Sequence, residues 1–322
     1  AITLTEAITG GSLSFSAAGR ESGTHVLTLT GSSSLSLASI GVVGTGLGGN
    51  VDNISEAYNQ RLTFENTTAN VSGNAAVGRG MLYLNGATMN VGGTILANNA
   101  WNVFRADNST LTATGGINFS SIASAVELYG GTVTTPFIKV GNATWTGGTG
   151  LYLSGVTVMA TQDSTDYIQV YNDGNTGSRA AARLYGNGGI LNSNGHAVTI
   201  DTVLFGDGFL TKTGTGTLTL SKSNTYTSNT SVNEGTLEIS ATGKLYGGGY
   251  IYGPVVTVAS GTTLRLNAWN YNDAGGLANL DFSRELLVVN GGTIDYAGNP
   301  TDPSNPGAAG RNFAIGTGGA TL

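Results

Sequence analysis

The chain has 322 residues, of which 52 are glycine and only 10% are Asp, Glu, Lys or Arg, whereas a soluble globular domain usually carries about a quarter of charged residues. A net charge of −6, with no run of Lys or Arg, excludes nucleic acid and anionic membrane as expected partners, and no apolar stretch is long enough for a membrane helix. Cysteine is absent, which excludes disulfides, thiolate chemistry and cysteine metal sites, but this leaves export from the cell open.

The first 37 residues alternate apolar and polar side chains in short runs. The runs are ITLTEAI at 2–8, SLSFS at 12–16, HVLTLT at 25–30 and SLSL at 34–37. Alternation with period two places every second side chain on one face of a strand. The pattern predicts four short strands separated by glycine-containing turns.

A glycine-rich segment follows at 44–49 (GTGLGG) and matches the dinucleotide-binding pattern G-x-G-x-x-G. The next residues, 52–62, are compatible with a helix capped by Asp52 or Asn53. A dinucleotide site needs strand–helix–strand units around the loop, and no second helical pattern follows. We therefore expect a glycine-rich loop with one helical turn at the surface, and no cofactor.

One pattern recurs between residues 82 and 158. It is LYLNGATMNVG at 82–92, VELYGGTV at 126–133 and LYLSGVTV at 151–158, and in each a strand ends at a glycine corner before a second strand begins. LLVVNGGTIDY at 286–296 repeats it near the end. Two strands meeting at a corner in every turn predict a parallel β-helix, because an antiparallel sandwich has no reason to repeat one motif.

The clearest repeat consists of four apolar doublets, with spacings of 20, 19 and 19 residues. They are Val198/Ile200, Leu218/Leu220, Leu237/Ile239 and Val256/Val258. A fixed period of about 20 to 50 residues is typical of solenoids. We predict an all-β fold, with one right-handed parallel β-helix (β-solenoid) domain over residues 1–299 whose coils have roughly 19–25 residues.

The same region carries a family resemblance. LTKTGTGTLTL at 210–220, SNTYT at 223–227 and VNEGTLEI at 232–239 resemble the autotransporter-associated β-strand repeat, and the resemblance spans residues 191–240. Beyond a Pro/Gly loop at 300–310, residues 311–322 resemble the start of a further strand or repeat. The resemblance implies an autotransporter passenger-like β-solenoid, located outside the cell or on the surface of a bacterium.

Histidines and aspartates are the first candidates for chemistry. His25 and His196 stand on separate coils, so neither a catalytic triad nor a histidine metal site is expected. Asp163, Asp166 and Asp173 form the densest acidic group, which could hold calcium or supply the acid and base of glycosidic cleavage. Asp is also common in turns, where its side chain bonds nearby amides, and turn bonding is the favoured interpretation.

Aromatic residues gather near the carboxyl-terminal third of the chain. They are Tyr246, Tyr250, Tyr252, Trp269 and Tyr271. If exposed on consecutive coils, their rings would form a strip for sugar binding, because apolar ring faces pack on sugar rings. The alternative, which we favour, is that they shield the flank of the solenoid.

Nothing in the chain combines a base, a nucleophile and oxyanion donors, so we expect no enzyme activity. The favoured function is that of an extracellular structural protein, a surface or matrix solenoid or an adhesin. The alternatives are a carbohydrate-binding or polysaccharide-cleaving β-helix and a phage fibre. Both ends have strand-like sequences without a cap, so we expect end-to-end self-association through residues 2–8, and polysaccharide or a cell surface as a further partner.

Overall fold

A computed structural model describes residues 2–3, 5–18, 25–45, 60–98, 102–120, 124–141, 150–171, 181–246, 254–267, 286–296 and 313–321. Strands are the only regular elements of this part, and it holds no helix with the length and hydropathy of a membrane span. The chain divides into two compact units, Ala1–Met159 with Gln169–Ala182, and Ala160–Ile168 with Arg183–Leu322. Both are all-β parallel solenoids, as the sequence predicts.

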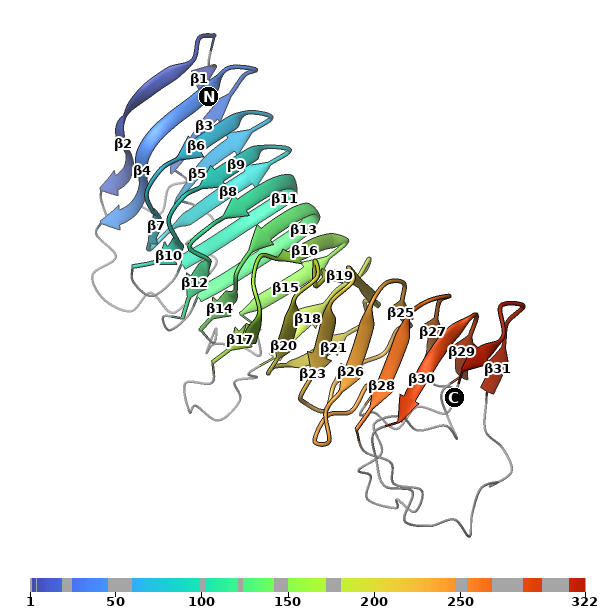
Figure 1. Ribbon diagram of the computed structural model, residues 1–322. Helices are drawn as coiled ribbons and strands as arrows, with labels where there is room; N and C mark the ends of the chain where they lie inside the picture. Colours follow the sequence, from blue (N-terminus) through green and yellow to red (C-terminus); the bar gives the residue numbers. More distant parts are fainter. Residues whose placement is uncertain are drawn as a thin grey trace. The chain divides into compact units, whose positions relative to one another are not determined.

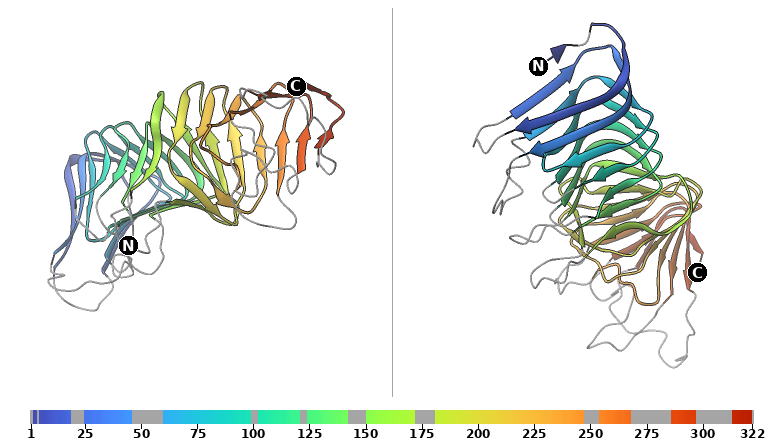
Figure 2. Two further views of the ribbon diagram at one scale, coloured as in Figure 1. Left: turned by 90° about the horizontal axis from the view of Figure 1, so that it is seen from below. Right: turned by 90° about the vertical axis from the view of Figure 1, so that its left-hand side faces the viewer.

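The first unit winds through three faces in each coil. In Figures 1 and 2 its blue to green strands lie side by side. The first face holds β1 (Ile2–Thr3), β3 (His25–Thr30), β5 (Gln60–Glu65), β8 (Met81–Asn85), the first halves of β11 (Asn102–Ala113) and β13 (Ser124–Thr135), and β15 (Leu151–Ser154).

The second face holds the first halves of β2 (Ile8–Ala18) and β4 (Ser34–Thr45), then β6 (Thr68–Val71), β9 (Thr88–Val91), the second halves of β11 and β13, and β16 (Val156–Ala160). The third face holds the second halves of β2 and β4, then β7 (Ala75–Gly78), β10 (Ile95–Ala97), β12 (Ile117–Phe119) and β14 (Ile138–Val140). The four strands predicted for the first 37 residues are therefore confirmed, and two of them extend around a corner.

The second unit also has three lines of parallel strands. The first is β18 (Ala181–Leu184), β21 (Val203–Gly206) and β24 (Thr225–Tyr226). The second is β19 (Gly189–Asn192), β22 (Leu210–Thr213), β25 (Thr230–Val232), β27 (Val255–Val258), β29 (Leu286–Val289) and β31 (Phe313–Ile315). The third is β17 (Ser164–Val170), β20 (Ala197–Ile200), β23 (Thr217–Leu220), β26 (Thr236–Ile239), β28 (Thr263–Leu266), β30 (Gly292–Tyr296) and β32 (Ala320–Thr321).

The core of each unit consists of rows in which one inward side chain stacks on the next. On the second face of the first unit, one row is Leu35, Ala69, Met89, Leu111 and Val133, all buried and in register. Burying a Leu, Val or Met side chain contributes about 1.5–3 kcal/mol to stability. Because each coil touches only its neighbours, such rows stabilise the stack coil by coil.

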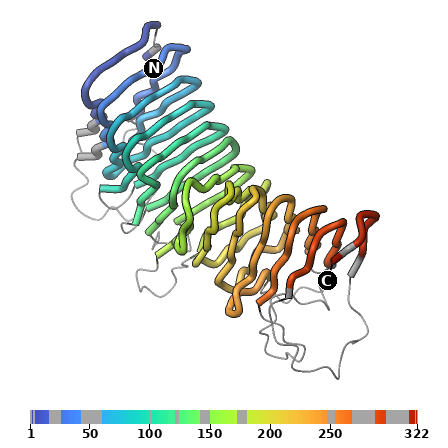
Figure 3. The backbone as a smooth tube through the Cα atoms, in the orientation of Figure 1, coloured from blue at the N-terminus to red at the C-terminus, as the bar shows by residue number. Residues whose placement is uncertain are grey.

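The corner between the first and second faces needs a left-handed backbone in successive coils. Asn66, Gly86, Asn108 and Gly130 occupy it with φ values of 49°, 59°, 46° and 71°. Gly and Asn are the residues that adopt this conformation readily. Ladder hydrogen bonds continue through the corner, from the amide of Gly86 to the carbonyl of Asp107 (2.9 Å), so the corners stack as in the tube of Figure 3. This is the physical reason for the recurring glycine in the predicted motif.

The doublet ladder predicted between residues 198 and 258 is confirmed for three doublets and wrong for the fourth. Val198 pairs with Leu218, and Leu218 with Leu237. Leu237 then pairs with Leu264, 27 residues on, while Val256 lies in the other line beside Thr230. Coils of 20 to 22 residues occur between β5 and β13, but later coils are longer than the predicted 25. Added residues between strands lengthen a coil without disturbing its registers.

Two other expectations fall largely outside the described residues. Gly44 and Thr45 end β4, and residues 46–59, which include Asp52 and Asn53, are not described; residues 60–62 of the expected helical segment belong to strand β5. The Pro/Gly loop at 300–310 is also outside the described part. Residues 313–321 do contain strands, β31 and β32.

Candidate functional site

The acidic group predicted from the sequence is used in turn bonding where it is described. The carboxylate of Asp163 accepts a hydrogen bond from the amide of Ala197 (3.0 Å) and lies 3.2 Å from Nδ1 of His196. These contacts, the amide first, hold the pKa of Asp163 below its usual range. Asp166 bonds the hydroxyl of Ser164 (3.3 Å), and Asp173 lies outside the described residues. Throughout the described ranges, no three His, Asp or Glu side chains come together as a metal site.

The aromatic group is described only at Tyr246, which is buried. Its hydroxyl bonds Oγ1 of Thr230 (2.6 Å), which also bonds the hydroxyl of Tyr226 (2.6 Å). The two tyrosine rings meet edge to face, with centroids 5.0 Å apart. Tyr246 therefore packs in the core and presents no ring face for a sugar. The other four members, Tyr250, Tyr252, Trp269 and Tyr271, lie outside the described residues.

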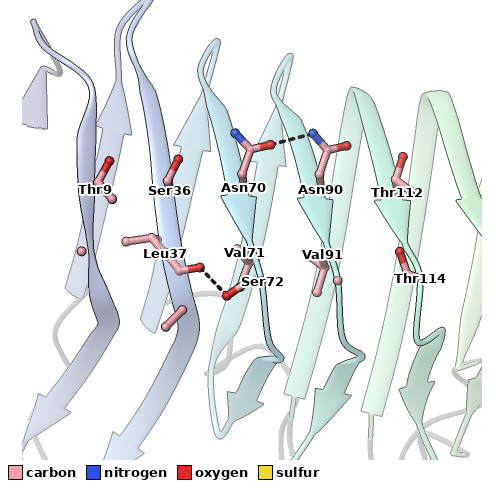
Figure 4. A pocket seen from close by; sticks show the side chains of 13 residues that line it. Thr9, Ser36, Leu37, Asn70, Val71, Ser72, Asn90, Val91, Thr112 and Thr114 are labelled. Atoms are coloured by element: carbon pink, nitrogen blue, oxygen red, sulfur yellow. Dashed lines mark hydrogen bonds between the residues drawn. The ribbon is translucent and has the colours of Figure 1, made fainter.

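An elongated pocket lies on the second face of the first unit, and we call it the five-strand pocket. It has a volume of about 470 Å³ and is lined by residues of five consecutive strands or their ends, β2, β4, β6, β9 and β11. Its central row is Thr9, Ser36, Asn70, Asn90 and Thr112, which are direct register partners. Figure 4 shows these side chains in one line across the strands. None of the lining residues is charged or aromatic.

The polar groups of this row are only partly used within the protein. Nδ2 of Asn90 donates to Oδ1 of Asn70 (2.9 Å), which leaves the other amide atom of each side chain available. The hydroxyls of Thr9, Ser36 and Thr112 make no hydrogen bond to other residues of the described part. At the corner below, Ser72 bonds the carbonyl of Leu37 (3.5 Å). The pocket thus offers hydroxyl and amide groups at regular intervals, without charge.

A charged cluster on the first face of the same unit is satisfied by its own contacts. Arg105 donates to both carboxylate oxygens of Asp107 (Nε–Oδ1 2.9 Å, Nη2–Oδ2 2.7 Å) and lies 3.5 Å from Glu127. Its guanidinium also covers the rings of Tyr83 and Tyr129 at 5.4 and 4.9 Å. The hydrogen bonds to Asp107 are the main cause of the raised pKa of Arg105, and burial is the main cause of the raised pKa of Tyr129. The arrangement holds the outer surface of three coils together.

The segment that resembles a known repeat contains a buried lysine. Lys212 lies in phase with the inward Leu210, and its side chain is fully buried. Its ammonium donates to the carbonyls of Thr213 (2.8 Å), Gly214 (2.7 Å) and Glu234 (3.0 Å), which lie at the corners of two successive coils. The sequence analysis did not single out Lys212, although its alternation with Leu210 is the signal that could have done so.

Comparison with known families gives one match, in this segment. Residues 210–239 match the family described as the passenger-associated-transport-repeat, which supports the autotransporter passenger-like solenoid predicted from the sequence. Neither the curated proteins nor the solved structures that were compared gave a match. The repeat covers strands β22 to β26 and indicates an exported protein of the bacterial surface.

Proposed function

We propose that this chain is a non-catalytic structural segment of a bacterial surface protein, a solenoid that carries binding surfaces outside the cell. The observation that supports this most is the position of the matched repeat. Its strands pair with coils on both sides, β22 with β19 and β23 with β20 before it, and β25 with β27 and β26 with β28 after it. The passenger-type repeat is thus an integral coil of a longer stack.

The physical properties of the fold suit this role. Backbone hydrogen bonds between parallel coils satisfy the main chain without disulfides, and the outward side chains are mostly Ser, Thr and Asn. Such a surface retains its structure over changes of ionic strength, since few of its contacts are ion pairs. The head-to-tail association of copies, expected from the sequence, stays a prediction.

Surface exposure on the living cell tests the proposal. Intact cells of the source bacterium are treated with protease, and peptides released into the medium are identified by mass spectrometry. We expect peptides of this chain before lysis, together with labelling of intact cells by antibodies against the purified chain. A cytoplasmic protein serves as the lysis control. Recovery of the peptides only after lysis would overturn the proposed location and function.

A further inference from the structure

We propose that the five-strand pocket binds a neutral, polyhydroxylated polysaccharide chain that lies across the strands. This goes beyond the proposed function, which requires only that the solenoid is exported and structural. The pocket volume of about 470 Å³ is in the usual range of ligand sites. Because five neighbouring strands are spaced by about 4.8 Å, the row from Thr9 to Thr112 spans about 19 Å, which suits an extended polymer rather than a compact molecule.

The charge of the pocket selects the ligand class. No Lys or Arg lines it, so a polyanion such as nucleic acid or an acidic polysaccharide would find no counter-charge. No Asp or Glu lines it either, so a cationic ligand is equally unsupported. What remains is a ligand recognised by neutral hydrogen bonds, and hydroxyls suit hydroxyl and amide partners because each can both donate and accept.

The position of the pocket on the sheet disfavours an extended peptide. Peptides commonly bind sheets by adding a strand to a free edge. The pocket lies on the face of the sheet, where β6 is paired with β4 on one side and with β9 on the other. Side chains rather than backbone groups must therefore make the contacts. The row of Ser36, Asn70, Asn90 and Thr112 supplies such contacts at each strand.

Binding of neutral oligosaccharides to the full chain tests this inference. The probes are cellohexaose, laminarihexaose, maltohexaose and mannohexaose, with an oligogalacturonate as the acidic comparison, and affinity is measured by titration calorimetry or NMR. We expect at least one neutral hexaose to bind more tightly than the acidic one. The double variant Asn70→Ala/Asn90→Ala should lower that affinity at least about tenfold, because two amide partners are lost.

A matched control and a shape-preserving variant complete the test. Asn118→Ala, on β12 outside the pocket, should leave the affinity unchanged, and Thr112→Val removes one hydroxyl with little change of shape. If the double variant loses thermal stability, Thr112→Val decides, with an expected loss of about threefold or more. The inference is overturned if no neutral hexaose binds, if the acidic probe binds as tightly, or if the pocket variants bind like the control. None of these results bears on export, which the protease experiment on cells decides separately.

Discussion

Replacement of Gly131 by alanine is expected to lower the free energy of unfolding by about 3 kcal/mol. Gly131 has φ of +72° on β13, where an L side chain costs about 1–2 kcal/mol. A Cβ atom there would also overlap the carbonyl oxygen of Ser109 and lie 2.6 Å from its amide nitrogen. Since both atoms belong to the backbone of the neighbouring coil, relief requires the two coils to separate. Urea unfolding followed by circular dichroism measures the change.

Gly41→Ala is the matched control for this substitution. Gly41 lies in β4 without a positive φ, and its added Cβ would meet only Oγ of Ser14 at 3.9 Å. An alanine in a compatible strand position should be neutral or slightly stabilising, by about 0.4–1 kcal/mol. If Gly131→Ala and Gly41→Ala unfold at the same urea concentration, the close stacking of β11 and β13 is incorrect.

The second large effect is expected at Lys212. Lys212→Ala removes a fully buried side chain and leaves three carbonyls without their ammonium donor, so the free energy of unfolding should fall by about 3 kcal/mol. Lys212→Met keeps most of the buried volume and should cost less. Lys222→Ala is the control, because that lysine is exposed and its ion pair with Asp201 lies at the surface. Equal unfolding midpoints for the alanine variants at 212 and 222 would contradict the assignment.

The same lysine gives stability a pH dependence. Burial lowers the pKa of Lys212 to about 8 from its ordinary 10.5, and the charge of Glu234 opposes this shift. Between these two values the unfolded chain holds a proton that the folded chain has released, so the free energy of unfolding rises with pH in this window. The contribution is constant below about pH 8. Subtracting the pH profile of Lys212→Met from that of the unchanged protein should show the rise, and a flat difference would contradict it.

Periodicity alone was sufficient to predict the fold class and three of the four doublets. Alternation shows that Leu237 and Val256 point inward, but it does not show to which of three faces each belongs. The coil between Leu237 and Leu264 has more residues than the one before it, so a constant period moved Val256 to the wrong line. The period is reliable where successive coils have the same length, as between Leu62 and Leu82.

The site was less predictable than the fold, for a different physical reason. Sequence reasoning looked for charged and aromatic side chains, and the only described member of the aromatic group, Tyr246, bonds Thr230 inside the core. The five-strand pocket is made of common residues whose significance depends on stacking. Asn70 and Asn90 stand 20 residues apart in a chain rich in Asn, and only their shared register brings them together.

Paired cysteines test the three-faced register of the solenoid most directly, in a protein that has no cysteine of its own. Directly opposed residues of neighbouring parallel strands lie about 4.8 Å apart, within the range of a disulfide. We expect Ser231→Cys/Thr257→Cys to form the bond under mild oxidation, because these residues are register partners. We expect Glu238→Cys/Thr257→Cys not to form it, because Glu238 is opposed by Arg265. Mass spectrometry of the unreduced protein shows the bond. A disulfide in the second pair and none in the first would contradict the register and, with it, the three-faced fold.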